Sequence, residues 1–147
     1  MSAAPPLPPR PVPDQDTLPF WDGVAERMLI VPRCASCGQW IWQPRPVCYR
    51  CRATNPVWTQ VSGNGRVASW TVLHPPVLPV WADRLPLVVL LVELDEGIRM
   101  VGQLVDDEGT LLQTDGTAEG LAMGARVALR WRKEADITLP AWTLVGD

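Results

Sequence analysis

From residue 54 onward, apolar and polar positions alternate in short runs, which is the period of a β-strand. The alternation is clearest on either side of "SGNG" at 62–65, a strong turn signal. An almost continuous apolar run follows at 87–95, as in a buried strand, and the "EG" pair after it predicts a hairpin with the next run. The expected strands are 57–63, 65–74, 87–95, 98–105, 125–134 and 141–145, with a proline-bearing loop before the last.

Helical periodicity is confined to one segment near the N-terminus. Phe20, Val24 and Met28 recur at the spacing of one helix face. We therefore expect a short helix over about 18–27, and a short strand at 28–32 that leads to the first cysteine.

Two long connections interrupt the strands. Residues 75–86 contain four prolines and cannot form an interior strand, so we expect a loop with one helical turn near 80–83. Residues 106–124 are acidic and rich in glycine, which predicts an irregular connection before the last two strands.

All four cysteines lie in "RCASCGQWIWQPRPVCYRC", residues 33–51, as two Cys-x-x-Cys pairs. Two such turns on facing hairpins bring four sulfurs into a tetrahedron, which is the geometry of a structural zinc site. The predicted ligands are Cys34, Cys37, Cys48 and Cys51. Because four thiolates close the coordination shell, the zinc is expected to be structural rather than catalytic.

The two cysteine turns differ in the residue that follows them. Gly38 follows Cys37, where the backbone favours glycine, whereas Arg52 follows Cys51, so we expect a less regular second turn. Iron held by four thiolates, a disulfide pair and a redox dithiol are the alternatives. Redox Cys-x-x-Cys motifs usually occur once, at a helix start in a βαβ setting that this sequence lacks.

These elements predict a mainly β protein: a short N-terminal helix, a rubredoxin-like zinc ribbon and a five-stranded OB-fold barrel, with a β-sandwich as the competing architecture. The expected division is a disordered, proline-rich tail at 1–16, the helix and ribbon at 17–53, and the OB-fold domain at 54–147.

Charge and hydropathy exclude several classes of function. The net charge is −3, with a single lysine and no basic block, which argues against nucleic-acid binding. No apolar run approaches the ~20 residues of a membrane span. The N-terminus has no hydrophobic stretch of the kind found in secretory signals, so we expect a cytoplasmic protein in a reducing compartment.

No catalytic constellation is recognised, and we predict no catalytic residue. His74 is the only histidine; it is interpreted either as a hydrogen-bonded strand-end residue or as a ligand or partner contact at the barrel mouth. The acids Glu93, Asp95 and Glu96 lie around a turn and are interpreted as solvated charges.

Tryptophan is unusually abundant, with eight residues against one Tyr and one Phe. Trp40 and Trp42 flank Ile41 on the ribbon and would share one face, while Trp81 lies in the proline-rich loop. Because tryptophan is enriched at interface hot spots, we expect at least one exposed indole to anchor a partner.

The order of parts resembles a known family. A Phe-Trp helix, the cysteine segment, "VSGNGRVASWTVLH", a proline-rich loop, "VVLLVELDEGIRMVGQLV" and "MGARVALRW" follow one another. This arrangement, over about 17–145, is similar to the zinc-ribbon/OB-fold proteins catalogued as domain of unknown function 35 and associated with thiolase-like enzymes.

The resemblance implies a non-catalytic accessory subunit of a thiolase, synthase or aldolase that acts on acyl-CoA. It implies that the helix and ribbon dock on a thiolase-fold partner, in a heterotetramer, and that the OB fold covers the acyl-CoA channel. Candidate partner or ligand contacts are Trp40, Trp42, His74, Trp81, Arg45 and Arg66.

Three arginines are candidates for CoA phosphates, because the guanidinium fork suits phosphate; they are Arg33, Arg45 and Arg66. A single-stranded nucleic-acid module is the alternative function, since ribbons and OB folds both occur there, although it would need a basic groove. A small iron electron carrier is the third hypothesis.

Overall fold

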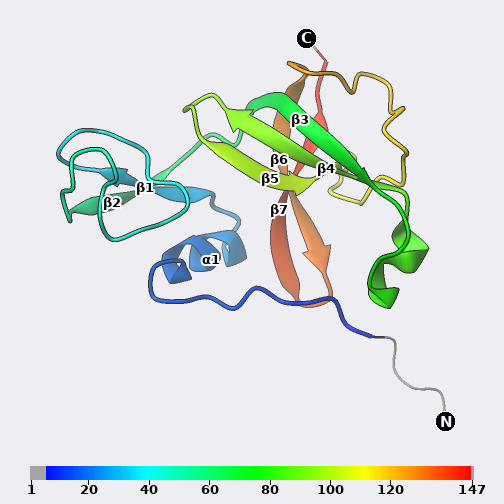
Figure 1. Ribbon diagram of the computed structural model, residues 1–147, viewed down its shortest axis with the longest axis horizontal. Helices are drawn as coiled ribbons and strands as arrows, with labels where there is room; N and C mark the ends of the chain where they lie inside the picture. The colour runs from blue at the N-terminus through cyan, green and yellow to red at the C-terminus, as the bar shows by residue number, and fades with distance from the viewer. Residues whose placement is uncertain (1–5, 147) are drawn as a thin grey trace.

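The computed structural model describes residues 6–146 and divides them between a two-stranded ribbon and a five-stranded sheet, with one α-helix packed against both (Figure 1). The elements are α1 (Leu18–Ala25), β1 (Ile30–Cys34), β2 (Pro56–Gln60), β3 (Gly65–Leu73), the 3₁₀ helix η1 (Pro79–Arg84), β4 (Leu87–Leu94), β5 (Arg99–Gln103), β6 (Arg126–Glu134) and β7 (Ile137–Leu144).

Helix α1 is shorter than its sequence pattern predicted. Phe20 and Val24 are buried, as the helical spacing required, but Met28 lies beyond the helix end and is 37% exposed. The chain turns back at Arg27, where φ is +59°, and the Met28 amide donates to the Gly23 carbonyl at 2.7 Å. A left-handed residue cannot continue a right-handed helix, which is why α1 ends early.

The main sheet is antiparallel, with strand order β5-β4-β3-β6-β7. Strand β7 begins at Ile137, four residues before the predicted start, and contains Pro140 opposite Trp131 of β6. The expected proline-bearing loop is therefore wrong, and a tight turn at Ala135 and Asp136 replaces it. Proline is tolerated here because β7 is an edge strand.

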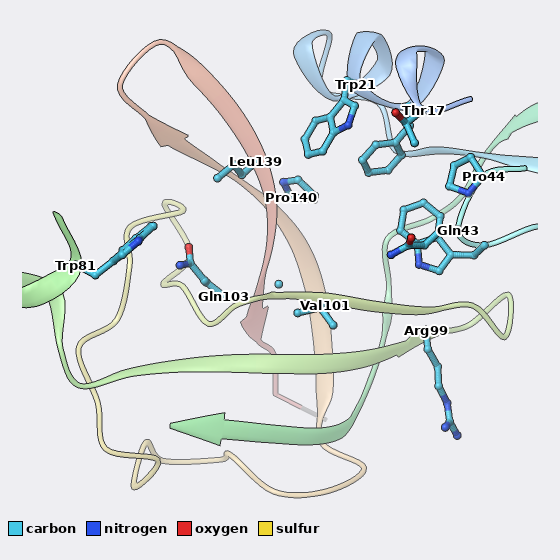
Figure 2. A pocket seen from close by; sticks show the side chains of 13 residues that line it. Thr17, Trp21, Gln43, Pro44, Trp81, Arg99, Val101, Gln103, Leu139 and Pro140 are labelled. Carbon is cyan, nitrogen blue, oxygen red and sulfur yellow. The ribbon is translucent and has the colours of Figure 1, made fainter. Parts of the chain in front are cut away.

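The predicted five-stranded OB-like arrangement is confirmed, but the barrel is not closed. Among residues 6–146, one parallel bridge pairs the end of β5 with β7, from Leu104 to Trp142, where the Val105 amide donates to the Trp142 carbonyl at 2.9 Å. The two strands lie close at Gly102, where a Cβ would be 3.3 Å from the Pro140 carbonyl oxygen, but no other bridge joins them in the described part of the chain, which leaves an unpaired seam in the side of the barrel (Figure 2).

The ribbon sheet pairs β1 with β2, from Ile30 opposite Gln60 to Cys34 opposite Pro56. The sequence placed β2 among the OB strands, but its pairing partner precedes the cysteine segment. Between the cysteine pairs the backbone pairing is limited to one bridge, Arg33 to Trp40, because the prolines that follow exclude a longer ladder.

Two hydrophobic clusters form the core. The larger one is centred on the sheet, where Trp142 is fully buried and its Nε1 donates to the Gly63 carbonyl at 3.0 Å. The smaller one joins Ile41 to Cys34 and Cys48 inside the ribbon. The ribbon therefore has a separate core beside its cysteines.

Residues 6–16 contain no helix or strand and lie against α1 and the β6–β7 hairpin. Pro8 is buried, and the Arg10 guanidinium pairs with the Asp136 carboxylate and lowers its pKa. Residues 1–5 of the predicted tail lie outside the described residues.

Within the described residues, 6–146, no helix has the length and apolar character needed to cross a membrane.

Candidate metal centre and adjoining groove

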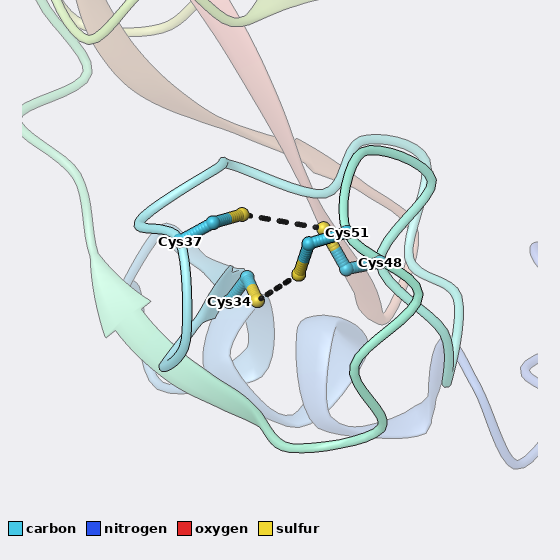
Figure 3. Close-up of side chains that lie close together, drawn as sticks. All are labelled: Cys34, Cys37, Cys48 and Cys51. Carbon is cyan, nitrogen blue, oxygen red and sulfur yellow. Dashed lines mark hydrogen bonds between the residues drawn. The ribbon is translucent and has the colours of Figure 1, made fainter.

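The four cysteine sulfurs converge at one end of the ribbon (Figure 3). All four lie within 4.8 Å of one another, and the Sγ–Sγ distances are 3.5 Å for Cys34–Cys51 and 3.7 Å for Cys37–Cys48. Zinc–sulfur bonds of about 2.3 Å in a tetrahedron require sulfurs about 3.8 Å apart. The donor set and spacing therefore fit one zinc ion.

The two cysteine turns have the same backbone geometry. Gly38 N donates to Cys34 O at 2.9 Å, and Arg52 N donates to Cys48 O at 2.8 Å. Gly38 and Arg52 both have positive φ, +73° and +64°. The prediction of a less regular second turn is therefore wrong, because Arg52 adopts the left-handed conformation despite its side chain.

Backbone amides favour the thiolate form at the buried positions. The Cys37 amide is the largest influence on Cys34, lowering its pKa to about 6. The Cys51 amide likewise lowers the pKa of Cys48. At Cys51 the Ala53 amide lowers the pKa, but the side chains of Cys37 and Cys34 outweigh it and raise that pKa to about 12. Because zinc binds thiolates, binding of the ion here would be coupled to the release of protons from these thiols.

A groove of about 730 Å³ lies between α1, the ribbon loop and the barrel seam (Figure 2). One wall carries Phe20 and Trp21 of α1, and the ribbon loop with Gln43 and Pro44 lies at one end. The opposite wall is formed by the facing edges of β5 and β7. Trp81 of η1 lies at the other end.

The structure brings only two of the predicted contact residues together, because Trp42 and Trp81 both line this groove. Trp40 packs under the guanidinium of Arg33, with 5.0 Å from Cζ to the ring centroid. Three further candidates lie elsewhere on the exposed surface; they are Arg45, Arg66, whose Nη1 donates to the Gly124 carbonyl at 2.8 Å, and His74.

The expectation of an exposed indole anchor is wrong for the isolated chain. Each of the eight tryptophans is at least partly buried, and seven of them pack on the main core or belong to it. Trp40 and Trp42 do flank the buried Ile41, as the alternation predicted, but they turn toward the sheet. Their packing on the main hydrophobic cluster joins the ribbon to the barrel.

Trp81 is held by a charged cluster that sequence reasoning missed. Its ring lies 5.0 Å from Arg84 Cζ and 5.8 Å from Arg132 Cζ. Both guanidiniums donate to Glu134 Oε2, with 2.5 Å for Arg84. The hydrogen bond from Arg84 lowers the pKa of Glu134, whereas burial lowers the pKa of Arg132. The sequence shows the charged residues of "RWRKE" at 130–134, but it does not show that the distant Arg84 pairs with Glu134.

The acids around the β4–β5 turn have structural partners. Asp95 accepts from Arg126 Nη1 at 2.8 Å, and this hydrogen bond lowers the pKa of Asp95. Glu93 accepts from Arg99 Nε at 2.8 Å, and Glu96 accepts from the Ser62 amide at 2.7 Å. Glu93 and Asp95 are about half exposed, as expected for solvated turn charges, but each also has a protein partner.

Two family models match adjoining parts of this chain. Residues 21–57 match "ChsH2, rubredoxin-like zinc ribbon domain", and residues 58–132 match "ChsH2, C-terminal OB-fold domain". The boundary between them falls within β2.

Several proteins of known name are similar in sequence. A probable enoyl-CoA hydratase alpha subunit of Thermomonospora curvata is 33% identical over 92% of this chain and 40% of its own length. The 3-oxo-4,17-pregnadiene-20-carboxyl-CoA hydratase alpha subunit of Mycobacterium tuberculosis is 38% identical over 65% of this chain and 30% of its own. The chain thus spans less than half of each of these relatives.

Two relatives are closer to this chain in length. A DUF35 domain-containing scaffold protein of Methanocaldococcus jannaschii is 35% identical over 63% of this chain and 67% of its own length. Among solved structures, a chain of the Ltp2-ChsH2(DUF35) aldolase superposes with a TM-score of 0.78 and 30% identity, covering 92% of this chain and 98% of that one.

Proposed function

Because the chain belongs to the ChsH2 family of zinc-ribbon and OB-fold proteins, we propose that it is a non-catalytic accessory subunit of an acyl-CoA enzyme. The observation that carries the proposal is the match to 98% of a chain of the Ltp2-ChsH2(DUF35) aldolase. The names of the two hydratase alpha subunits support an acyl-CoA substrate. A thiolase-fold enzyme of the thiolase, synthase or aldolase type is the proposed partner.

The zinc ion in this proposal is structural. Four cysteines with suitable spacing supply a complete tetrahedral shell, so the ion would fix the ribbon and leave no position for substrate. The ribbon in turn carries Trp42 to the groove beside the barrel seam. Zinc thereby supports the surface that we assign to the partner.

The partner would dock on the side formed by α1, the ribbon loop and the groove. Trp42 and Trp81 both line this groove, and its aromatic walls are typical of an interface centre. The OB-fold domain would then cover the acyl-CoA channel of the partner. Two copies of each chain would form a heterotetramer.

The test is to isolate the protein with its bound chains from its own cells and to assay acyl-CoA cleavage and condensation. We expect activity in the isolated complex and none in the purified chain alone. Activity of the chain alone would contradict a non-catalytic role. A complex without an acyl-CoA enzyme would contradict the accessory role.

A further inference from the structure

We infer that the outer edge of β5 binds an extended, uncharged apolar segment of the partner chain as an added β-strand in the groove. This inference rests on the proposed function, because it identifies how the partner subunit is held. It follows from the backbone pairing of β5, the proline in β7 and the lining of the groove.

The hydrogen bonds of β5 show which of its backbone groups face outward. Leu94 N donates to Ile98 O at 2.8 Å, and Leu104 N donates to Val88 O at 3.0 Å, so even-numbered residues of this strand face β4. In an antiparallel pair the alternate residues point the other way. The N–H and C=O of Arg99 and Val101 therefore point away from β4, and no strand pairs with these two residues on that side among residues 6–146.

Strand β7 cannot pair with this part of β5. The Val145 amide donates to Arg126 O, so in the β6–β7 register it is Pro140 and Trp142 that face β5. Trp142 makes the single bridge, but Pro140 has no N–H to donate. From Trp142 toward Pro140, β7 therefore lacks the backbone N–H that would continue the pairing. Strand β5 keeps an unpaired edge of the kind that partner strands use.

The groove fits an apolar and uncharged segment. Arg99 is the only ionisable residue among those that line it, and its side chain points away from α1 toward Glu93 (Figure 2). Val101 is 66% exposed at the centre of β5. An added strand would cover Val101 and meet the aromatic wall of α1 while its backbone pairs with Arg99 and Val101, so charge and hydrogen bonding agree on one occupant.

Amide hydrogen exchange of the chain, alone and in the complex with its co-purified partner, tests this inference. In the free chain we expect the Met100 and Gly102 amides to be protected and the Val101 amide to exchange rapidly. In the complex we expect exchange at Val101 to slow at least a hundredfold. Protection of Val101 in the free chain, or rapid exchange in the complex, would overturn the inference and leave the accessory role standing.

Val101→Pro provides an independent test, because it removes an outward N–H and no hydrogen bond to β4. We expect partner binding to weaken at least tenfold, whereas Val101→Thr, which keeps the N–H, should change it less than threefold. The thermal midpoint of Val101→Pro reports whether this variant folds. If the variant does not fold, the amide exchange experiment on the unmodified chain tests the inference. Equal binding by the proline variant would overturn the inference; a chain that captures no partner would contradict both proposals.

Discussion

At residue 52 an arginine occupies the backbone conformation that glycine occupies at residue 38, and both make the same turn hydrogen bond. A side chain in the left-handed region costs about 1–2 kcal/mol relative to the right-handed one. The zinc site therefore contains a small, local destabilisation that glycine would remove.

We predict that Arg52→Gly raises the free energy of unfolding of the zinc-loaded chain by about 1 kcal/mol. Urea denaturation of both proteins at the same zinc concentration measures the difference. The matched change Gly38→Ala introduces the same conformational cost at the first turn and should lower stability by a similar amount. A lower stability of Arg52→Gly together with a higher stability of Gly38→Ala would contradict the equivalence of the turns.

The Arg132–Glu134 pair is the buried charge pair of the sheet, with exposures of 4% and 5%. Glu134→Gln would leave the Arg132 guanidinium buried without a carboxylate, which typically costs about 3–5 kcal/mol. Because Arg84 is one-third exposed, it can turn into solvent and leave Arg132 as the one buried charge without a carboxylate, so we expect the lower end, about 3 kcal/mol at pH 7. Equilibrium urea unfolding tests this, and a loss under about 1 kcal/mol would show that the pair behaves as a surface one.

The same pair predicts a pH dependence. The hydrogen bond from Arg84 lowers the pKa of Glu134, so its contribution is present above the unfolded-state pKa of about 4.3. That contribution is lost as pH falls through the lowered folded-state pKa. The stability difference between wild type and Glu134→Gln should therefore shrink below pH 4 when urea midpoints are compared across pH. A constant difference from pH 7 to pH 3 would contradict the assignment.

At the scale of elements, Gly102 allows β5 and β7 to approach at the barrel seam. A Cβ at this position would collide with the ring of Trp142. We predict that Gly102→Ala lowers the free energy of unfolding by about 1–3 kcal/mol, the usual cost of overpacking. Gly146→Ala meets no atom within 4 Å and is the control, with an effect within about 0.5 kcal/mol. Equal midpoints for the two variants would mean that the seam is looser than described.

The ribbon is a separate unit of stability because its core consists of Ile41 packed on Cys34 and Cys48. Cys48→Ser should abolish stoichiometric zinc binding and unfold the ribbon, since metal binding and folding are coupled in such sites. The sheet should remain folded around the buried Trp142. Zinc analysis and amide exchange test this together. Ser36→Ala is the control, and protection retained in β1 and β2 of the zinc-free variant would contradict the prediction.

For the whole molecule, local signals predicted more than long-range ones. The cysteine spacing and the alternating strands were sufficient for the zinc ribbon and for an OB-like sheet. The predicted start of β7 was too late because Pro140 was taken as a loop residue. A proline is tolerated in a strand only where tertiary structure makes that strand an edge, which the sequence does not show. The pairing of β2 with β1 and the meeting of Arg84 with Glu134 depend on contacts far apart in sequence. No local pattern specifies such contacts.

The groove illustrates the same difference between local and global information. Trp42 and Trp81 were predicted as contacts from residue type alone, yet only the fold brings them to one groove with β5. Their indoles are partly buried in the free chain, so they can contribute walls to an interface without exposing a large apolar surface. A surface of this kind suits a chain that functions within a complex.

The most direct measurement of the central claim is the mass and composition of the complex purified from its own cells through this chain. The accessory-subunit account predicts a thiolase-fold, acyl-CoA enzyme in equal molar amount, in an assembly of two copies of each chain. Native mass spectrometry gives both the identity and the stoichiometry. A lone zinc-bound species of the chain's own 16.2 kDa, at cellular concentration and low salt, would contradict the account.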